Sequence, residues 1–426
     1  MKVFKFGGAS VKDSPSVRNM AKILSRFEGD RLCVIISAMG KTTNALEKVA
    51  DAWIKSDIHA IGLLNEVEAY HLAISYELDG AGAEQIKSIV QGIRMLLQSA
   101  PPDLYDAAYD LIVSNGELMS TAIVSDFLNL SGITNQLLDV RRVLITDDSY
   151  RNARIYWQES IAKIKAAFDE SNPGHFAPVT ITQGFIGSSA NGHPVTLGRE
   201  GSDFSAAIFA YALDATQMII WKDVPGVLNA DPRYFSNTVL LDKISYRDAV
   251  ELAYFGASVI HPKTIQPLQN KSIPLYVKSF EQPDENGTLI HNFDNQPLKT
   301  PCYIVKQNQV LISISATDFS FIAEDGLHTI FGLLSNLGIH INLMQNSAIS
   351  FSICTDDNED KLNRLFRALS GDFRVKYNRG LELITIRYYN KKTIDAIVNK
   401  REIYLEQKSR LTVQLVVDAA GKPAKQ

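Results

Sequence analysis

The N-terminal part of the chain alternates between short apolar runs and segments with helical periodicity. Lys2 to Phe6 has the pattern of a strand, and Leu32 to Ile36 is apolar at every position, as in a strand buried on both faces. Between them, apolar residues recur at helical spacing from Val17 to Phe27. This order predicts a βαβ unit at the start of the chain.

The alternation continues towards the middle of the chain. Residues 42–130 have a mostly helical pattern, and short apolar strands then separate further helical stretches. We expect strands at 135–140, 178–183, 216–221 and 274–279, and helices at about 153–169, 203–214 and 245–256. Strands and helices in this order predict an α/β fold, a three-layer α/β/α sandwich with a mainly parallel sheet.

A change of pattern near residue 300 predicts a second kind of domain. Residues 281–301 are rich in Pro, Asn, Asp and Gly and have no periodicity. From 310 to 377 the expected order is strand, helix, strand, strand, helix, strand, a ferredoxin-like βαββαβ arrangement, and a shorter set follows at 381–417. We therefore expect domains at 1–300 and 301–378, a shortened second unit at 379–418, and a disordered tail at 419–426.

Composition and charge narrow the class of protein. The 426 residues include 43 Lys and Arg against 47 Asp and Glu, so the formal charge is −4, and 46% of residues are apolar. This balance excludes a disordered chain and provides no basic footprint for nucleic acid. No apolar run approaches the about 20 residues of a membrane span, and no secretory signal is recognisable, so we expect a cytoplasmic protein. The three Cys residues lie far apart and predict free thiols.

Glycines at the end of the first expected strand form a candidate phosphate site. In the segment Lys5 to Gly8, a Gly pair lets backbone N–H groups approach a phosphate while the lysine supplies a positive charge. A tight turn with a solvated lysine is the simpler explanation of these residues alone. Gly40-Lys41-Thr42 is not a P-loop, because Ile35 stands where that motif requires Gly, and no GxGxxG spacing supports a dehydrogenase. The eight His residues form no metal-ligand pattern, so no metal site is expected.

Three later segments combine glycines with charged residues. The segment 196–203 opens an expected helix, and its Arg199 can grip a carboxylate through two hydrogen bonds. Asp203 is equally compatible with an ordinary charge at a helix start. The segment 222–233 follows a strand, where open α/β sheets bind their ligands, although Asp-Pro and Pro-Gly are also turn dipeptides. Segment 115–121 places a Gly and a carboxylate within a helical region. Because Gly is unfavourable in a helix, it indicates either a binding site or a break in the helix.

Seven sequence blocks, taken in order, closely resemble aspartate kinase. They are KFGGASV (5–11), SAMGKTTN (37–44), NGELMST (115–121), TQGFIG (182–187), TLGREGSD (196–203), KDVPGVLNADPR (222–233) and FGASVIHPKTI (255–265). The resemblance covers about the first 300 residues, and the βαββαβ tail resembles the ACT regulatory module that follows the kinase domain in that family. It implies the amino acid kinase fold with a C-terminal ACT region.

The resemblance implies an ATP-dependent phosphotransferase that acts on a carboxyl group. The γ-phosphoryl group of ATP would pass to the β-carboxylate of L-aspartate, giving 4-phospho-L-aspartate, the first step toward lysine, threonine and methionine. A carboxylate and a triphosphate repel each other, so cations and N–H groups must neutralise and position both. Mg²⁺ would be held mainly through phosphate oxygens and water, and no protein ligand is assigned to it.

The resemblance also assigns roles by motif. Lys5 and Asp203 resemble the catalytic lysine and the carboxylate that orients the cations. The residues expected around ATP are Gly7, Gly8, Ser10, Lys222, Asp223, Gly226 and Arg233, and those expected around aspartate are Ser37, Thr43, Glu117 and Arg199. The residues expected around an amino-acid effector, threonine or lysine, are Asn342, Gln345, Asn346 and Ser347. The family further implies a homodimer or higher oligomer formed through the ACT region.

The chain departs from the family pattern at several positions. Many members have Lys where this chain has Ser258, and Lys263 in the next turn is a candidate replacement. In the lysine-inhibited branch an Asp and a Glu often stand where this chain has Asn342 and Ala348. The other departures are Glu200, Lys222 and Leu228. Two alternatives stay open: a non-catalytic amino-acid sensor of the same fold, and a sister kinase that acts on another carboxylate.

Overall fold

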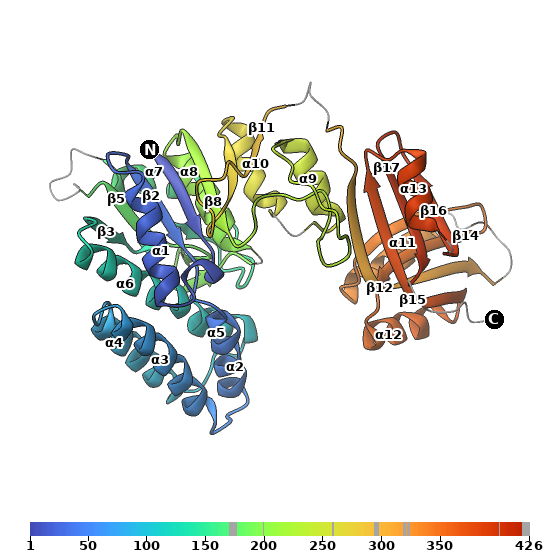
Figure 1. Ribbon diagram of the computed structural model, residues 1–426. Helices are drawn as coiled ribbons and strands as arrows, with labels where there is room; N and C mark the ends of the chain where they lie inside the picture. The colour runs from blue at the N-terminus through green and yellow to red at the C-terminus, as the bar shows by residue number, and fades with distance from the viewer. Residues whose placement is uncertain are drawn as a thin grey trace. The chain divides into compact units, whose positions relative to one another are not determined.

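The computed structural model describes residues 1–169, 177–198, 200–257, 260–293, 298–317, 321, 324–399 and 401–419 (Figure 1). The chain forms two compact units. The first comprises Met1–Val227, Leu240–Val250 and Ser258–Gln296, and the second comprises Leu228–Val239, Glu251–Ala257 and Pro297–Gln426. None of the described helices has the length and apolar content that a bilayer-spanning segment needs.

An eight-stranded sheet forms the centre of the first unit. Its order is β3-β5-β2-β1-β8-β10-β11-β9, and neighbouring strands run parallel except for β10 and β11. The strands are β1 (Lys2–Phe6), β2 (Leu32–Ile36), β3 (Asn135–Leu138), β5 (Val179–Gln183), β8 (Gln217–Lys222), β9 (Lys243–Ser245), β10 (Leu275–Ser279) and β11 (Thr288–His291). The predicted, mainly parallel sheet is thus confirmed, whereas β9 and β11, the two strands at one end of it, were not predicted.

Helices cover both faces of this sheet, which gives the three predicted layers. On one face, α1 (Ser14–Ser25) and the helices from α2 (Thr42–Ile54) to α6 (Asn115–Leu130) share a core with Phe4, Phe6 and Trp221. On the other face, α8 (Gly201–Ala212) packs against β1, β2 and β8. Because side chains alternate along a strand, Lys5 points to the α8 side. The remaining helices are α3 (Ala60–Glu77), α4 (Ala83–Leu97), α5 (Tyr105–Val113), α7 (Trp157–Ala167), α9 (Tyr246–Phe255) and α10 (Pro262–Asn270).

Short elements beside the main sheet shape the loops that carry the sequence motifs. A three-stranded sheet consists of β4 (Ile145–Thr146), β6 (Ile186–Ser189) and β7 (Pro194–Thr196), and 3₁₀ turns lie at Gly8–Val11 and Val140–Arg142. The sequence did not predict these elements, because two to four residues carry too few positions to show a periodicity.

A six-stranded antiparallel sheet forms most of the second unit, in the order β13-β14-β12-β15-β17-β16. Its strands are β12 (Cys302–Ala316), β13 (Ile341–Asn346), β14 (Ser350–Asp356), β15 (Phe373–Arg387), β16 (Ile403–Lys408) and β17 (Thr412–Asp418). Its helices are α11 (Glu324–Asn336), α12 (Glu359–Leu369) and α13 (Lys391–Val398). The first two pack around Val310, Ile312 and Ile314 of β12, and α13 packs on Ile384 and Ile386 of β15.

Two strands of this sheet are longer than the sequence pattern indicates. β12 and β15 have 15 residues each and pair with one another over most of that length. The first half of β12 pairs with 383–387, and the second half pairs with 373–378, with register shifts between Lys306 and Leu311. The first half of β12 therefore supplies a fourth strand to the shorter set that the sequence placed at 379–418.

Candidate functional site

A cavity of about 520 Å³ opens in the first unit where β1, β2 and β8 end and α8 begins. In open α/β sheets, this edge of the sheet is where ligands bind. The predicted residues that line it are Lys5, Gly8, Ser37, Thr43, Glu117, Asp203 and Lys222. The other lining residues are Ala38, Gly40, Tyr109, Arg151, Phe185, Thr196, Gly198, Glu200, Gly201 and Ser202. The structure therefore brings together residues expected around both substrates.

Two lysines flank one buried carboxylate in this cavity. Lys5 Nζ lies 2.7 Å from Asp203 Oδ1, and Lys222 Nζ lies 3.7 Å from Asp203 Oδ2. Asp203 is in the first turn of α8 and is almost completely buried. Burial alone would raise its pKa, but the charges of Lys5 and Lys222 outweigh burial and hold the pKa of Asp203 below its usual value. The result is a fixed, ionised carboxylate between two ammonium groups.

The glycine loop after β1 lies directly against the loop after β2. A Cβ on Gly8 would come within 2.7 Å of the Ala38 carbonyl oxygen, and Gly40 N–H donates to the Gly8 carbonyl oxygen over 3.0 Å. Gly8 is thus required for the close approach of the two loops. Ser10, also expected near ATP, is buried, and its hydroxyl donates to the Trp221 carbonyl oxygen over 3.3 Å. That bond ties the loop to the end of β8.

Glu117 places a second carboxyl group in the cavity, from the first turn of α6. Its side chain is 2% exposed, and Oε1 accepts a hydrogen bond from Ala38 N–H over 3.2 Å. Oε2 is buried and has no hydrogen-bond partner among the described residues. Burial raises the pKa of Glu117 to about 8. A cationic ligand group would favour the ionised form of this carboxyl group and so offset the cost of its burial, which suits the site to such a ligand.

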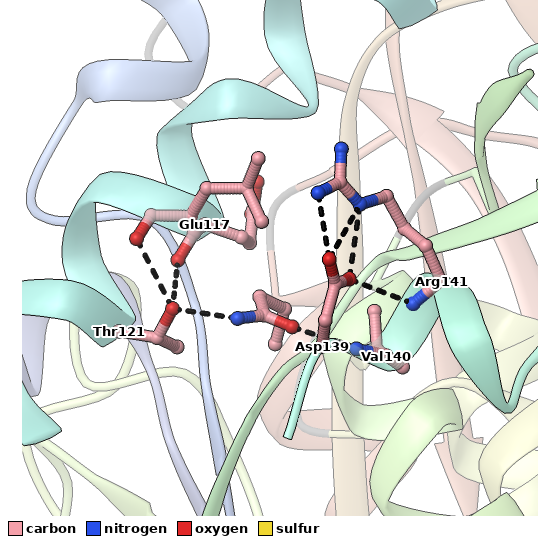
Figure 2. Close-up of polar contacts among 7 residues, drawn as sticks. Glu117, Thr121, Asp139, Val140 and Arg141 are labelled. Carbon is pink, nitrogen blue, oxygen red and sulfur yellow. Dashed lines mark hydrogen bonds and ion pairs between the residues drawn. The ribbon is translucent and has the colours of Figure 1, made fainter. Parts of the chain in front are cut away.

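A chain of hydrogen bonds fixes the helix that carries Glu117 (Figure 2). The Thr121 hydroxyl donates to the Glu117 carbonyl oxygen over 2.9 Å and accepts from the Gln183 side-chain amide over 2.8 Å. The side-chain oxygen Oε1 of Gln183 in turn accepts from Val140 N–H over 2.9 Å. The turn around Val140 is itself closed by the pair between Asp139 and Arg141, shown at the right of the figure. The start of α6 is therefore anchored to β5 and to the neighbouring 3₁₀ turn.

Arg151 is a cavity residue that the sequence analysis missed. Its backbone N–H donates to Asp110 Oδ2 over 3.0 Å, and the same buried carboxylate accepts from the N–H and the hydroxyl of Thr196. Its guanidinium carbon lies 4.2 Å from the centre of the Tyr109 ring. No motif marked this residue. Most of the other lining residues that were not predicted, such as Glu200, lie inside the motif segments 37–44, 182–187 and 196–203.

Several predicted residues of the first unit do not line the cavity. Asp223 is exposed in the loop after β8. Gly226 is buried with φ 153°, and a Cβ there would come within 2.6 Å of Thr288 Oγ1, so its role in the structure is close packing. Gly7 precedes the 3₁₀ turn, and a Cβ on it would lie 3.3 Å from Lys5 Nζ. Gly7 itself does not line the cavity, but Gly8 beside it and Lys5 two residues before it do.

Other predicted residues lie in the second unit or outside the described residues. Arg233 belongs to the second unit, where its exposed guanidinium is paired with a neighbouring aspartate. Arg199, the expected carboxylate clamp, and Ser258 lie outside the described residues. Lys263, the candidate replacement for a lysine at 258, is exposed and donates to Asn152 Oδ1 over 2.7 Å. It does not line the cavity.

The expected effector residues follow one edge strand of the second unit. Asn342 is half-buried and hydrogen-bonded to three side chains. Gln345 and Asn346 are exposed at the other end of β13. Ser347 closes the turn that follows, through hydrogen bonds with Ser350.

Comparison with known proteins relates the whole chain to kinases. The model of the amino acid kinase family matches residues 1–279. Lysine-sensitive aspartokinase 3 of Escherichia coli (strain K12) is 32% identical over 397 residues, which cover 90% of this chain and 86% of that protein. Two structures of E. coli aspartokinase III, one in complex with lysine and aspartate and one with aspartate and ADP, match with TM-scores of 0.83 and 0.81 at 29% identity. Both matches cover 98% of this chain and 96% of the other, so the similarity extends through both units.

Proposed function

Because the chain belongs to the amino acid kinase family, we propose that it is an aspartate kinase, which transfers the γ-phosphoryl group of ATP to the β-carboxylate of L-aspartate. One observation carries the proposal. A single cavity holds the Lys5–Asp203 ion pair, suited to a transferring phosphoryl group, and the buried carboxyl of Glu117, suited to an α-ammonium group. The similarity to a lysine-sensitive aspartokinase over most of the chain supports this choice of substrates.

The chemistry requires that two anions be brought together in line. A β-carboxylate oxygen forms a bond to the γ-phosphorus, and the bond from that phosphorus to the oxygen that bridges to the β-phosphate breaks. No proton is transferred in this step, so catalysis depends on position and charge. Lys5 and Lys222 supply positive charge at the start of α8, whose N-terminal N–H groups add to it. Asp203 holds both ammonium groups in place.

A magnesium ion fits this site if the nucleotide supplies most of its ligands. Asp203 is already paired with two lysines, whereas Glu200 has a buried carboxylate oxygen without a hydrogen-bond partner among the described residues. Glu200 also lines the cavity, so it is the carboxylate that we assign to such an ion, with phosphate oxygens and water completing the coordination. The ion would neutralise charge between the phosphates. No three His, Cys, Asp or Glu side chains gather as a metal site in the described parts of the chain.

The remaining assignments of the proposal follow the motifs. We place ATP near Gly7, Gly8, Ser10, Lys222 and Asp223, and aspartate near Ser37, Thr43, Glu117 and Arg199. The motif also assigned Gly226 and Arg233 to ATP, but Gly226 is packed against Thr288 and Arg233 belongs to the second unit, so neither is part of this proposal. Residues 1–300 form the catalytic domain in this proposal, and the ACT-like units at 301–378 and 379–418 bind an amino-acid effector and join two chains in a cytoplasmic homodimer. The long strands β12 and β15 support a regulatory region that acts as one body, because each contributes to both ACT-like units within the second compact unit.

The test is an ATP-dependent hydroxamate assay, which traps the acyl phosphate formed from L-aspartate. We expect aspartyl hydroxamate from the wild type and none above background from Lys5→Ala. Lys2→Ala, on the same strand but outside the cavity, is the matched control and should stay active. Added lysine or threonine should inhibit if the effector assignment is right. No product from aspartate, glutamate or acetylglutamate would contradict the kinase and favour an amino-acid sensor.

A further inference from the structure

Three of the nine described non-glycine residues with a left-handed backbone line the cavity. Among the described residues, four large side chains have a left-handed backbone: Arg151 (φ 60°), Phe185 (φ 66°), Glu200 (φ 56°) and Tyr388 (φ 58°). The first three line the cavity, and the fourth lies in the second unit. This conformation is unfavourable for a residue with a Cβ and is retained where the surrounding structure or a function requires it.

The backbone of Arg151 is held by contacts that are themselves buried. Asp110, which is 0% exposed, accepts its N–H, and the next-but-one residue, Ala153, donates to the Thr196 carbonyl oxygen over 3.1 Å. The Arg151 carbonyl oxygen would lie 2.9 Å from a Cβ on Gly198, so glycine at 198 lets the two segments meet. Arg151 is therefore locked against the strand end that leads into the TLGREGSD block.

The guanidinium of Arg151 is positioned but not saturated. It stacks over Tyr109 at 4.2 Å, donates a long hydrogen bond to Asp106 Oδ1 over 3.4 Å, and lies 3.8 Å from Glu47 Oε1. Both distances exceed those of a strong charge-assisted hydrogen bond, and the side chain is 40% exposed. A guanidinium carries five N–H donors in a planar fork that matches a carboxylate. Within the described part of the chain, Asp106 and Glu47 engage two of these donors, so Arg151 presents further donors to the cavity.

We propose that Arg151, in addition to the expected carboxylate clamp Arg199, binds the α-carboxylate of the aspartate substrate and so helps to select a substrate that carries this second carboxylate. The inference rests on the proposed aspartate kinase function. Arg151 approaches the cavity beside Tyr109 and Glu47, on the side formed by α2 and α5, whereas the lysine pair around Asp203 lies at the start of α8. The guanidinium of Arg151 can therefore contact the α-carboxylate on one side of the cavity, while the β-carboxylate reacts on the other side, near Lys5.

The test compares two substrates that differ at this group alone. L-Aspartate has a free α-carboxylate, and L-aspartate α-amide keeps the reacting β-carboxylate but lacks that charge. In the full chain, Arg151→Met should raise KM for aspartate about ten- to one-hundredfold and leave KM for the α-amide within twofold. The KM of Arg151→Lys for aspartate should lie between those of the wild type and Arg151→Met, because lysine keeps the charge but lacks the planar fork of donors. Arg154→Met, an exposed arginine of the same loop that does not line the cavity, should change neither.

A second pair of variants separates binding from folding. Arg151→Gly and Arg151→Ala lose the same side-chain contacts, but only alanine retains the strained backbone, so the glycine variant should have the higher Tm while both lose affinity for aspartate alike. If Arg151→Met raised both KM values equally, or left KM for aspartate within twofold, the inference would be wrong although the kinase assignment would stand. A wild type that does not phosphorylate aspartate would overturn both.

Discussion

Glu117→Gln tests the buried carboxyl group on which the proposed aspartate pocket depends. Burial raises the pKa of Glu117 from 4.5 to about 8, so about nine in ten of these side chains are protonated at pH 7. A bound α-ammonium favours the ionised carboxylate, so aspartate binding should release a proton from Glu117. Between about pH 6 and pH 7.5 the Kd of aspartate should therefore fall about tenfold per pH unit in the wild type, and this slope should vanish in Glu117→Gln.

The same proton changes the free energy of unfolding, with a sign set by the two pKa values. The folded protein binds the proton of Glu117 more tightly than the unfolded chain does. The stability contributed by this group is therefore fully present below pH 4.5 and is lost as the pH rises through about 8. At 1.36 kcal/mol per unit of pKa, a loss on the order of 3 kcal/mol is reached by pH 7. Gln keeps an acceptor for Ala38 N–H, so the variant should be the more stable protein at pH 8, and the difference should shrink towards pH 5.

Two measurements decide this prediction. Titration calorimetry of L-aspartate at about pH 6.5, in buffers of different ionisation enthalpy, counts the released protons, and urea unfolding from pH 5 to pH 8 measures stability. Glu66→Gln, at an exposed position of α3, is the control for loss of a carboxylate elsewhere. Proton release near zero in the wild type, together with parallel stability curves for the wild type and Glu117→Gln, would refute the reasoning, because Glu117 would then be ionised before aspartate binds.

Three further substitutions test other parts of the site. Gly8→Ala places a Cβ 2.7 Å from a carbonyl oxygen of the neighbouring loop, so hydroxamate formation should fall at least about tenfold and Tm should drop; unchanged values would show that the loop yields. Asp203→Asn leaves Lys5 without its anionic partner, and kcat should fall about a hundredfold or more with a smaller change in KM for aspartate, as steady-state kinetics would show. Thr121→Val leaves the Gln183 amide without its acceptor and should cost about 1–3 kcal/mol in urea unfolding, whereas Thr121→Ser should restore most of it.

Strands buried on both faces were the part of the fold most open to prediction. All five residues of β2 are buried, because helices cover both sides of the sheet, and a continuous apolar run of this length is typical of such a strand. β4 and β7 have two and three residues, and their pairing depends on neighbours that are distant in the sequence. The full length of β12 could not be predicted either, because its middle is polar around Gln307 and Asn308. Its pairing with β15 is irregular at the same place.

The residues of the candidate site likewise fall into those that the sequence could predict and those that it could not. Lys5, Glu117 and Asp203 could be predicted because each sits at a strand end or in the first turn of a helix, inside a motif whose element the pattern also predicted. Arg151 reaches the cavity through a hydrogen bond to Asp110, 41 residues earlier in the chain, which no local pattern encodes. The raised pKa of Glu117 likewise results from burial by surrounding elements and could not be inferred from its motif.

The second unit shows why a motif position does not by itself supply a ligand contact. Asn342 Oδ1 accepts a hydrogen bond from Lys306 Nζ over 2.7 Å, and Nδ2 donates to Gln309 Oε1 over 2.8 Å and to Asp356 Oδ1 over 2.9 Å. Both amide donors and the carbonyl oxygen are thus engaged within the unit. An ammonium group, that of Lys306, already occupies the place beside Asn342, so a cationic effector would have to displace it. If an amino acid binds along β13, the exposed side chains of Gln345 and neighbouring Asn346 can meet it without breaking this cluster, which favours an uncharged side chain over that of lysine.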